Sequence, residues 1–172
     1  MKDDIILKIG KVSNENILSY IDDIYIILNY WVGQTYIGIE KESDIKRAFQ
    51  LFFTYLYKAL IKNNLKEFLY EGTLYRYIGY SNSKKRQKFP KKPCYNTIWV
   101  SWSKNEENSY IESKLGYPMT RLQCHTTFPG IDLVALGIGR ENEAEVIYPT
   151  IENQIDKIEF KDKQNIWQNM EY

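Results

Sequence analysis

The chain has 172 residues and a mass of 20.5 kDa, which is the usual size of one folded domain. Hydrophobic residues make up 44% of the sequence and charged residues 26%, a balance that favours neither a disordered chain nor an integral membrane protein. The formal net charge is only +1, so binding to nucleic acid or to anionic lipid would need a local basic patch.

Histidine and cysteine are scarce, with one His and two Cys in the whole chain. This scarcity excludes structural zinc sites and iron–sulfur clusters that need several such ligands, and we expect no metal. Cys94 and Cys124 are expected to be free thiols, as in a reducing cytosol. Aromatic residues reach 15%, led by 15 tyrosines, and this abundance is typical of a ligand cleft as well as of a core.

The first residues, Met1-Lys2-Asp3-Asp4, are acidic where a signal peptide requires basic residues, and no apolar run of about 18 residues follows. We therefore expect a cytoplasmic protein, without a signal peptide or a membrane segment, that acts in its own cell or in a host cell. The bias toward Lys, Asn, Ile and Tyr indicates an AT-rich genome, which is compatible with a phage or bacterial effector.

The first third of the chain has helical periodicity. Apolar residues recur at three- and four-residue steps over residues 17–31, after the potential caps Ser13 and Asn14. A break at Gly33 and Gly38 precedes a second amphipathic pattern over residues 43–63. Both apolar faces are expected to be packing surfaces rather than catalytic ones.

From Gly72 onward the apolar pattern has a period of two. Residues 73–78 place Arg76 on the same face as Leu74 and Ile78, so a cation interrupts an otherwise aliphatic side. Further strands are predicted over residues 97–101, 121–128, 131–137, 145–148 and 154–160, with a short helix over 106–113 and a turn at 115–118.

Helices first and strands afterwards predict an α+β fold with a mostly antiparallel sheet. We expect a single domain over residues 1–172, with a helical part, 1–70, and a strand-rich part, 71–172.

A basic run lies between the first two predicted strands. Such a segment can hold phosphates or a single-stranded nucleic acid, or it can be a solvated loop that keeps the chain soluble. The run follows Tyr77 and Tyr80 and consists of Lys84, Lys85, Arg86, Lys88, Lys91 and Lys92.

Three features of the strand-rich part carry chemistry. Arg76 needs an anion, either a protein carboxylate or a bound phosphate. The segment Ser101-Trp102-Ser103 ends a predicted strand with two hydroxyl groups. Glu143 and Glu145, with Glu141 upstream, are expected to open a strand and to project to one side. Carboxylates this close need a compensating cation or ligand, unless they lie at a solvated strand entrance.

This order, Arg, then Ser-x-Ser, then Glu-x-Glu followed by Val-Ile-Tyr-Pro, resembles the mono-ADP-ribosyltransferases of the cholera-toxin-like or R-S-E class. The resemblance covers residues 72–160 and includes the apolar segment 130–136, which looks like the strand before the family's glutamates. It implies the split β-sheet of the ADP-ribosyltransferase fold, with an NAD cleft in the strand-rich part. Trp102 departs from the family's small central residue and could crowd the site or supply a stacking ring.

The resemblance also implies roles for individual residues. Glu145 would stabilise the positive charge that develops on the ribose as nicotinamide leaves, and Ser101 would orient it. Arg76 would hold the NAD phosphates, and Glu143 would position or deprotonate the acceptor, which a glutamate there suggests is an arginine side chain. NAD would serve as co-substrate and a protein as target. The catalytic candidates are Glu145, Glu143 and Ser101, and the NAD-binding candidates are Arg76, Tyr77, Ser101, Trp102, Ser103 and Phe128.

Other interpretations of these residues stay open. Arg76 could form an internal salt bridge with Glu145 or Glu143, and Ser101 and Ser103 could cap the following helix. A different acceptor, a nucleic acid or a small molecule, is an alternative, as is a non-catalytic nucleic-acid- or protein-binding module that uses the basic run. Any one aromatic candidate for nicotinamide, Trp102, Tyr117 or Phe128, could equally belong to the core.

Overall fold

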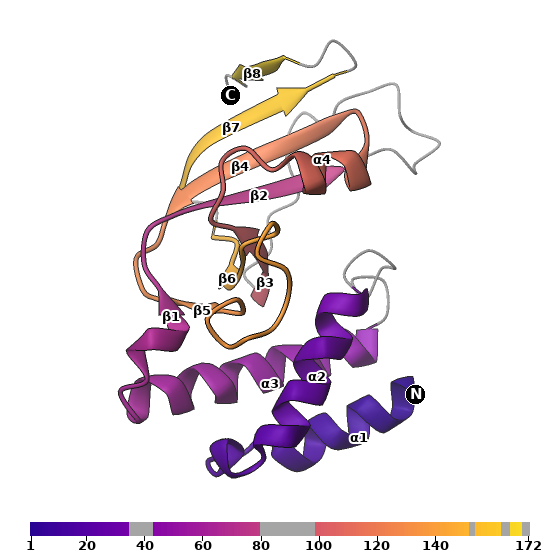
Figure 1. The fold of residues 1–172 in the computed structure, drawn as a ribbon, viewed down its shortest axis with the longest axis vertical. Helices are drawn as coiled ribbons and strands as arrows, with labels where there is room; N and C mark the ends of the chain where they lie inside the picture. Colours follow the sequence, from indigo (N-terminus) through magenta and orange to yellow (C-terminus); the bar gives the residue numbers. More distant parts are fainter. Residues whose placement is uncertain (35–42, 80–98, 152–153, 163–165, 170–172) are drawn as a thin grey trace. The chain divides into compact units, whose positions relative to one another are not determined.

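The computed structural model describes residues 1–34, 43–79, 99–151, 154–162 and 166–169. The chain divides into two compact units, and Figure 1 shows the elements of both. The helical unit comprises Met1–Leu69 and Ile131–Gly139, and the strand unit comprises Tyr70–Gly130 and Arg140–Tyr172. Each unit is described separately.

The helical unit contains the long helices of the chain, α1 (Lys2–Val12), α2 (Ile21–Gln34) and α3 (Ser43–Lys62). Its core is strongly aromatic: the Trp31 ring lies 4.9 Å from the Phe49 ring and 5.0 Å from the Phe53 ring. Trp31 and Phe49 belong to the two predicted apolar faces and are buried, so the prediction that both faces are packing surfaces is confirmed. Among the described residues, no helix is both long and apolar enough to cross a membrane.

The helix predicted over residues 17–31 is interrupted. Residues Ile17–Ser19 form a 3-10 turn, η1, in which the Tyr20 amide donates to the Ile17 carbonyl, and α2 begins only afterwards. The sequence analysis did not assign α1, although Ile5, Ile9 and Val12 are buried at four- and three-residue spacing. A second 3-10 turn, η3 (Lys66–Phe68), follows α3.

The strands form one curled sheet in the order β1-β5-β6-β3-β2-β4-β7-β8, and its paired ladders are antiparallel. The predicted α+β class with an antiparallel sheet is therefore confirmed. Most predicted strands are present within a few residues, and the short strands β1 and β8 were not predicted. The bounds are β1 (Leu69–Tyr70), β2 (Thr73–Gly79), β3 (Trp99–Ser103), β4 (Met119–His125), β5 (Gly130–Asp132), β6 (Glu145–Pro149), β7 (Ile155–Lys161) and β8 (Trp167–Asn169).

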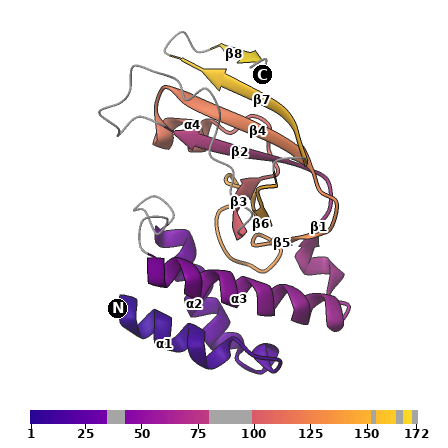
Figure 2. The same cartoon turned by 180° about the vertical axis from the view of Figure 1, so that it is seen from behind.

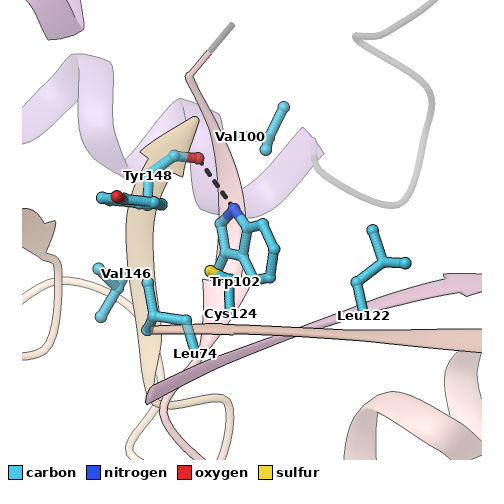
Figure 3. Close-up of a cluster of buried hydrophobic side chains, with 7 residues drawn as sticks. All are labelled: Leu74, Val100, Trp102, Leu122, Cys124, Val146 and Tyr148. Carbon is cyan, nitrogen blue, oxygen red and sulfur yellow. Dashed lines mark hydrogen bonds between the residues drawn. The ribbon is translucent and has the colours of Figure 1, made fainter. Parts of the chain in front are cut away.

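The sheet changes direction between β2 and β3. β2 pairs with β4 along its length, from Thr73 to Gly79, whereas its paired position with β3 is Tyr75 opposite Ser103. Figures 1 and 2 show β3 and β6 running across the direction of β2, β4 and β7. The core of the strand unit draws on β2, β3, β4 and β6 and contains Leu74, Val100, Trp102, Leu122, Cys124, Val146 and Tyr148 (Figure 3).

The strand predicted over residues 131–137 is wrong beyond its first residues, because β5 ends at Asp132. The Asp132 carboxylate accepts hydrogen bonds from the amides of Val134 and Ala135, at 3.1 Å each. Such a side-chain-to-backbone arrangement competes with strand pairing and starts a turn. The resemblance implied a strand over residues 130–136 before the glutamates, and the structure has a strand only over Gly130–Asp132 of that segment.

The short helix predicted over residues 106–113 is α4 (Ser109–Leu115), two to three residues later in the chain. The predicted turn follows it, because Gly116 ends the helix with a φ of 67°. A Cβ on Gly79, at the end of β2, would lie 2.9 Å from the Leu115 Cβ. Glycine thus permits the close approach of α4 to β2.

Candidate functional site

Strands β6, β3 and β2 lie next to one another in the sheet, and each carries one residue of the predicted Arg, Ser and Glu set. Glu145 is the first residue of β6 and pairs in register with Ser103 on β3. Because side chains alternate along a strand, Ser101 and Ser103 lie on the same face as Glu145. Val146 and its partner Trp102 occupy the opposite face.

Hydrogen bonds join the three predicted residues through Ser101. The Ser101 hydroxyl donates to Oε1 of Glu145, and Nη1 of Arg76 donates to the Ser101 carbonyl oxygen at 2.8 Å. The bond from Arg76 reaches the main chain of β3 and the bond to Glu145 leaves from the Ser101 side chain. Ser101 is therefore the central residue of a chain that runs Arg76, Ser101, Glu145, which we call the R-S-E chain.

Burial differs along the R-S-E chain. Glu145 is 4% exposed, whereas Ser101 and Arg76 are half-buried. Arg76 pairs in register with buried Leu122, so its position on the apolar face of β2 is as predicted. The Ser101 hydroxyl fixes the position of the Glu145 carboxyl group, and a guanidinium offers five N–H donors for an anion.

Glu143 lies outside the strand, so the expectation that it opens β6 together with Glu145 is wrong. Ala144 between them has a φ of 48°, a left-handed conformation that breaks the alternation of side chains. Glu143 is buried, and its Oε1 lies 3.9 Å from Nη1 of Arg140. The two glutamates are therefore positioned by different structures, a turn for Glu143 and a strand for Glu145.

Neither serine of the Ser-x-Ser segment caps the following helix, so that alternative is wrong. The N-cap of α4 is Asn108, whose side chain accepts a hydrogen bond from the Ile111 amide at 3.1 Å. Ser103 instead donates to the Glu143 carbonyl at 2.9 Å and accepts from the Asn105 amide at 3.1 Å. Ser103 thus holds the turn that precedes β6.

Trp102 is a core residue, which was the alternative to its predicted contact with NAD. Its side chain is 2% exposed and packs among Leu74, Val146 and the other core residues of the strand unit. Figure 3 shows its indole nitrogen donating to the Tyr148 carbonyl, at 2.9 Å. Because neighbouring strand residues face opposite sides, Trp102 cannot share a face with Ser101.

The other aromatic candidates contact protein groups. The Tyr77 hydroxyl donates to the carbonyl oxygens of Asn105, at 3.3 Å, and of Glu106, and burial raises the pKa of Tyr77 to about 12. The Phe128 ring lies 4.8 Å from the Tyr148 ring and packs against the core. These contacts give both residues a structural role, and their predicted contact with NAD stays a prediction.

Cys124 and His125 are neighbours on β4 that lie in different surroundings. Cys124 is buried in the core, while His125 is exposed, with Nδ1 3.5 Å from the Thr73 hydroxyl. Burial raises the pKa of the Cys124 thiol to about 12, so it is a poor nucleophile at neutral pH. Cys124 is a free cysteine.

The sequence analysis missed a further arginine of the sheet, Arg121, which is buried. Arg121 on β4 pairs in register with Glu159 on β7 and donates to its Oε2 from Nε, at 2.9 Å, and from Nη2, at 2.6 Å. The Trp167 ring lies 4.4 Å from the guanidinium carbon. A period-two pattern places Arg121 and Glu159 on strands but does not pair the strands, so no signal in the sequence joined the two residues.

The basic run at residues 84–92 lies outside the described residues, as does Cys94. Within the part of the chain that the structure describes, no group of three or more His, Cys, Asp or Glu side chains could hold a metal ion. In comparisons with known proteins, no family model, no curated protein and no solved structure matches this chain.

Proposed function

We propose that this protein is an NAD-dependent mono-ADP-ribosyltransferase, which transfers ADP-ribose from NAD to a protein side chain and releases nicotinamide. The observation that carries the proposal is the R-S-E chain, in which residues from three neighbouring strands are joined in the order that the sequence resemblance requires. The α+β fold, with helices before a curled antiparallel sheet, is compatible with the split sheet of that family.

Glu145 and Arg76 fit the two charged parts of NAD, the cationic nicotinamide riboside and the anionic pyrophosphate. When bound, NAD supplies an ADP-ribosyl group whose bond to nicotinamide breaks as positive charge develops on the ribose. A carboxylate held in place beside the ribose stabilises that charge, and the buried Glu145 with its Ser101 bond is suited to this role. Arg76 supplies the positive charge that binds the NAD phosphates. Its hydrogen bond to the Ser101 carbonyl holds it in a fixed position relative to Glu145, which bonds to the Ser101 hydroxyl.

Glu143 serves the acceptor in this proposal. As the acceptor atom bonds to the ribose carbon, nicotinamide leaves with the electron pair of the broken bond, and Glu143 takes the acceptor's proton. Its present neighbour is a guanidinium, that of Arg140 at 3.9 Å, so the carboxylate already lies in surroundings that accommodate an arginine side chain. Arginine is therefore the proposed acceptor residue, and the cytoplasm of the cell of origin or of a host is the proposed location.

The test is incubation of the purified protein with radiolabelled NAD and a bacterial lysate, with gel detection of labelled proteins and chromatography of released nicotinamide. Replacing Glu145 by Gln preserves shape and removes the charge, and we expect nicotinamide release to fall about 100-fold or more. Glu141→Gln is the matched control, because Glu141 is exposed and lies in the same segment.

Each outcome has a definite meaning. Labelled bands that vanish in Glu145→Gln and persist in Glu141→Gln support the proposal. A Glu145→Gln variant with the wild-type rate contradicts it, and so does a wild-type protein that releases no nicotinamide with any acceptor. Purified nucleic acid and a small guanidino compound, added in place of the lysate, distinguish the alternative acceptors.

A further inference from the structure

The buried Asn108 side chain connects two segments that the sequence separates widely. It is 4% exposed and lies between the end of β3 and the first turn of α4. Its Oδ1 accepts from the Ile111 amide, a group that can only donate, and this contact determines which way the side-chain amide faces. The Nδ2 group therefore points toward acceptors.

The acceptors of Asn108 Nδ2 lie in the turn that precedes β6. Nδ2 lies 2.8 Å from the Asn142 carbonyl oxygen and 3.4 Å from the Glu143 carbonyl oxygen, with the Ser103 hydroxyl at 3.3 Å. The Asn142 contact joins residues 34 positions apart. The Asn108 side chain thus caps α4 and also donates to the backbone of the turn that contains Glu143.

Two further hydrogen bonds join this turn to the end of β3. The Ser103 hydroxyl donates to the Glu143 carbonyl at 2.9 Å, and the Lys104 amide donates to the Ala144 carbonyl at 3.0 Å. Asn108 and Ser103 converge on the Glu143 carbonyl, while Glu145 is held by its strand pairing with Ser103 and by the Ser101 hydroxyl. A substitution of the Asn108 side chain therefore removes a bond to the Glu143 segment and keeps the bond from Ser101 to Glu145.

We propose that Asn108 is a positioning residue for Glu143, and that it determines how much of the ADP-ribosyl group reaches an acceptor rather than water. This inference rests on the proposed function. A loosened turn displaces the Glu143 carboxylate from the acceptor but leaves Glu145 bonded to Ser101 on β3. Cleavage of the bond to nicotinamide then continues, and water takes the place of the acceptor more often.

Asn108→Asp tests this inference, because it keeps an oxygen for the Ile111 amide and removes the N–H donors that face the turn. We expect transfer per nicotinamide released to fall about tenfold, with nicotinamide release in the absence of an acceptor within about threefold of wild type. Hydrogen exchange at the Glu143 and Ala144 amides, which bond to the Arg140 carbonyl, should become faster.

Glu112→Gln is the matched control. Glu112 lies in the first turn of α4, where its carboxylate accepts a hydrogen bond from Lys161, with Nζ 2.7 Å from Oε2. This variant should weaken the docking of α4 while leaving the transfer ratio unchanged. Asn108→Ser, which also keeps a capping oxygen, replaces Asn108→Asp if that variant does not fold.

The failures of the two proposals differ. A wild-type protein that releases no nicotinamide overturns the proposed function and this inference with it. An active wild-type protein with an unchanged transfer ratio in Asn108→Asp, or with an equal fall in Glu112→Gln, overturns the inference alone.

Discussion

Two arginines on neighbouring strands, Arg76 on β2 and Arg121 on β4, lie in different chemical surroundings. Arg121 is 4% exposed, is joined twice to the Glu159 carboxylate and lies beside the Trp167 ring. Arg76 is half-buried and donates to a backbone carbonyl, that of the residue whose hydroxyl holds Glu145. The two arginines thus differ in the groups they bond: Arg121 bonds to a buried carboxylate on β7, and Arg76 bonds to the main chain of the residue that holds Glu145.

The difference between the two arginines predicts opposite effects on stability and on activity for two Glu→Gln substitutions, one at Glu159 and one at Glu145. Glu159→Gln leaves the buried Arg121 with the exposed Glu106 carboxylate, 3.4 Å from Nη2, as its charged partner, and we expect the free energy of unfolding at neutral pH to fall by about 3 kcal/mol. Its activity per folded molecule should stay near that of wild type. Glu145→Gln, on the same sheet, should remove activity and change the free energy of unfolding by less than about 1 kcal/mol. Denaturant unfolding beside the nicotinamide assay measures both.

The stability deficit of Glu159→Gln should depend on pH. Although burial acts to raise it, hydrogen bonds from Lys157 and Arg121 hold the pKa of Glu159 below its ordinary value of 4.5. The stabilisation by the deprotonated carboxylate is thus fully present above pH 4.5 and is lost as the pH falls through the lower pKa of the folded protein. Unfolding curves of the two proteins should converge in acid, and a deficit independent of pH would contradict the ion-pair interpretation.

Trp102→Phe separates the core from the candidate site. The substitution removes the hydrogen bond to the Tyr148 carbonyl and part of a buried ring, and we expect the free energy of unfolding to fall by about 2 kcal/mol. The affinity for NAD should not change, since the ring lies on the face of β3 opposite Ser101. Denaturant unfolding and NAD titration measure the two effects. A large loss of NAD affinity in a stably folded variant would contradict this expectation and indicate that Trp102 contributes to NAD binding.

Arg76→Lys tests the functional member of the arginine pair. Lysine keeps the charge but loses the planar fork of donors, so we expect the KM for NAD to rise about tenfold. Arg121→Lys is the matched control, with lower stability and a KM for NAD within about twofold of wild type. Steady-state nicotinamide release at varied NAD measures both constants, and equal KM values in the two variants would remove the distinction drawn between Arg76 and Arg121.

Much of the local structure was predictable. The helix predicted over residues 43–63 is α3 (Ser43–Lys62), and the strand predicted over 73–78 is β2 (Thr73–Gly79), because in each the apolar period is regular and its ends are marked. The apolar residues after Asp132 suggested a strand that the structure does not contain. The Asp132 carboxylate bonds to the following amides and turns the chain there.

The candidate site was predictable in its residues but not in its geometry. Strand alternation alone indicates that Ser101 and Trp102 face opposite sides, so the core position of Trp102 was within reach of the sequence. The place of Glu143 was not, because it depends on the left-handed conformation of Ala144 and on bonds from Ser103 and Asn108. In the sequence, Asn108 is one of several polar residues before a short helix, and no pattern indicated its bond to the turn before β6.

The sequence by itself determined most of the helices and strands, the apolar face of β2, and the order of Arg76, Ser101 and Glu145 along the chain. These properties depend on residues two to four positions apart, so a local pattern records them. Only the tertiary structure decided which polar groups meet, since the bonds of Ser101 reach Arg76 and Glu145 across 25 and 44 positions. Contacts over such separations depend on strand order and register, which the packing of the whole sheet selects.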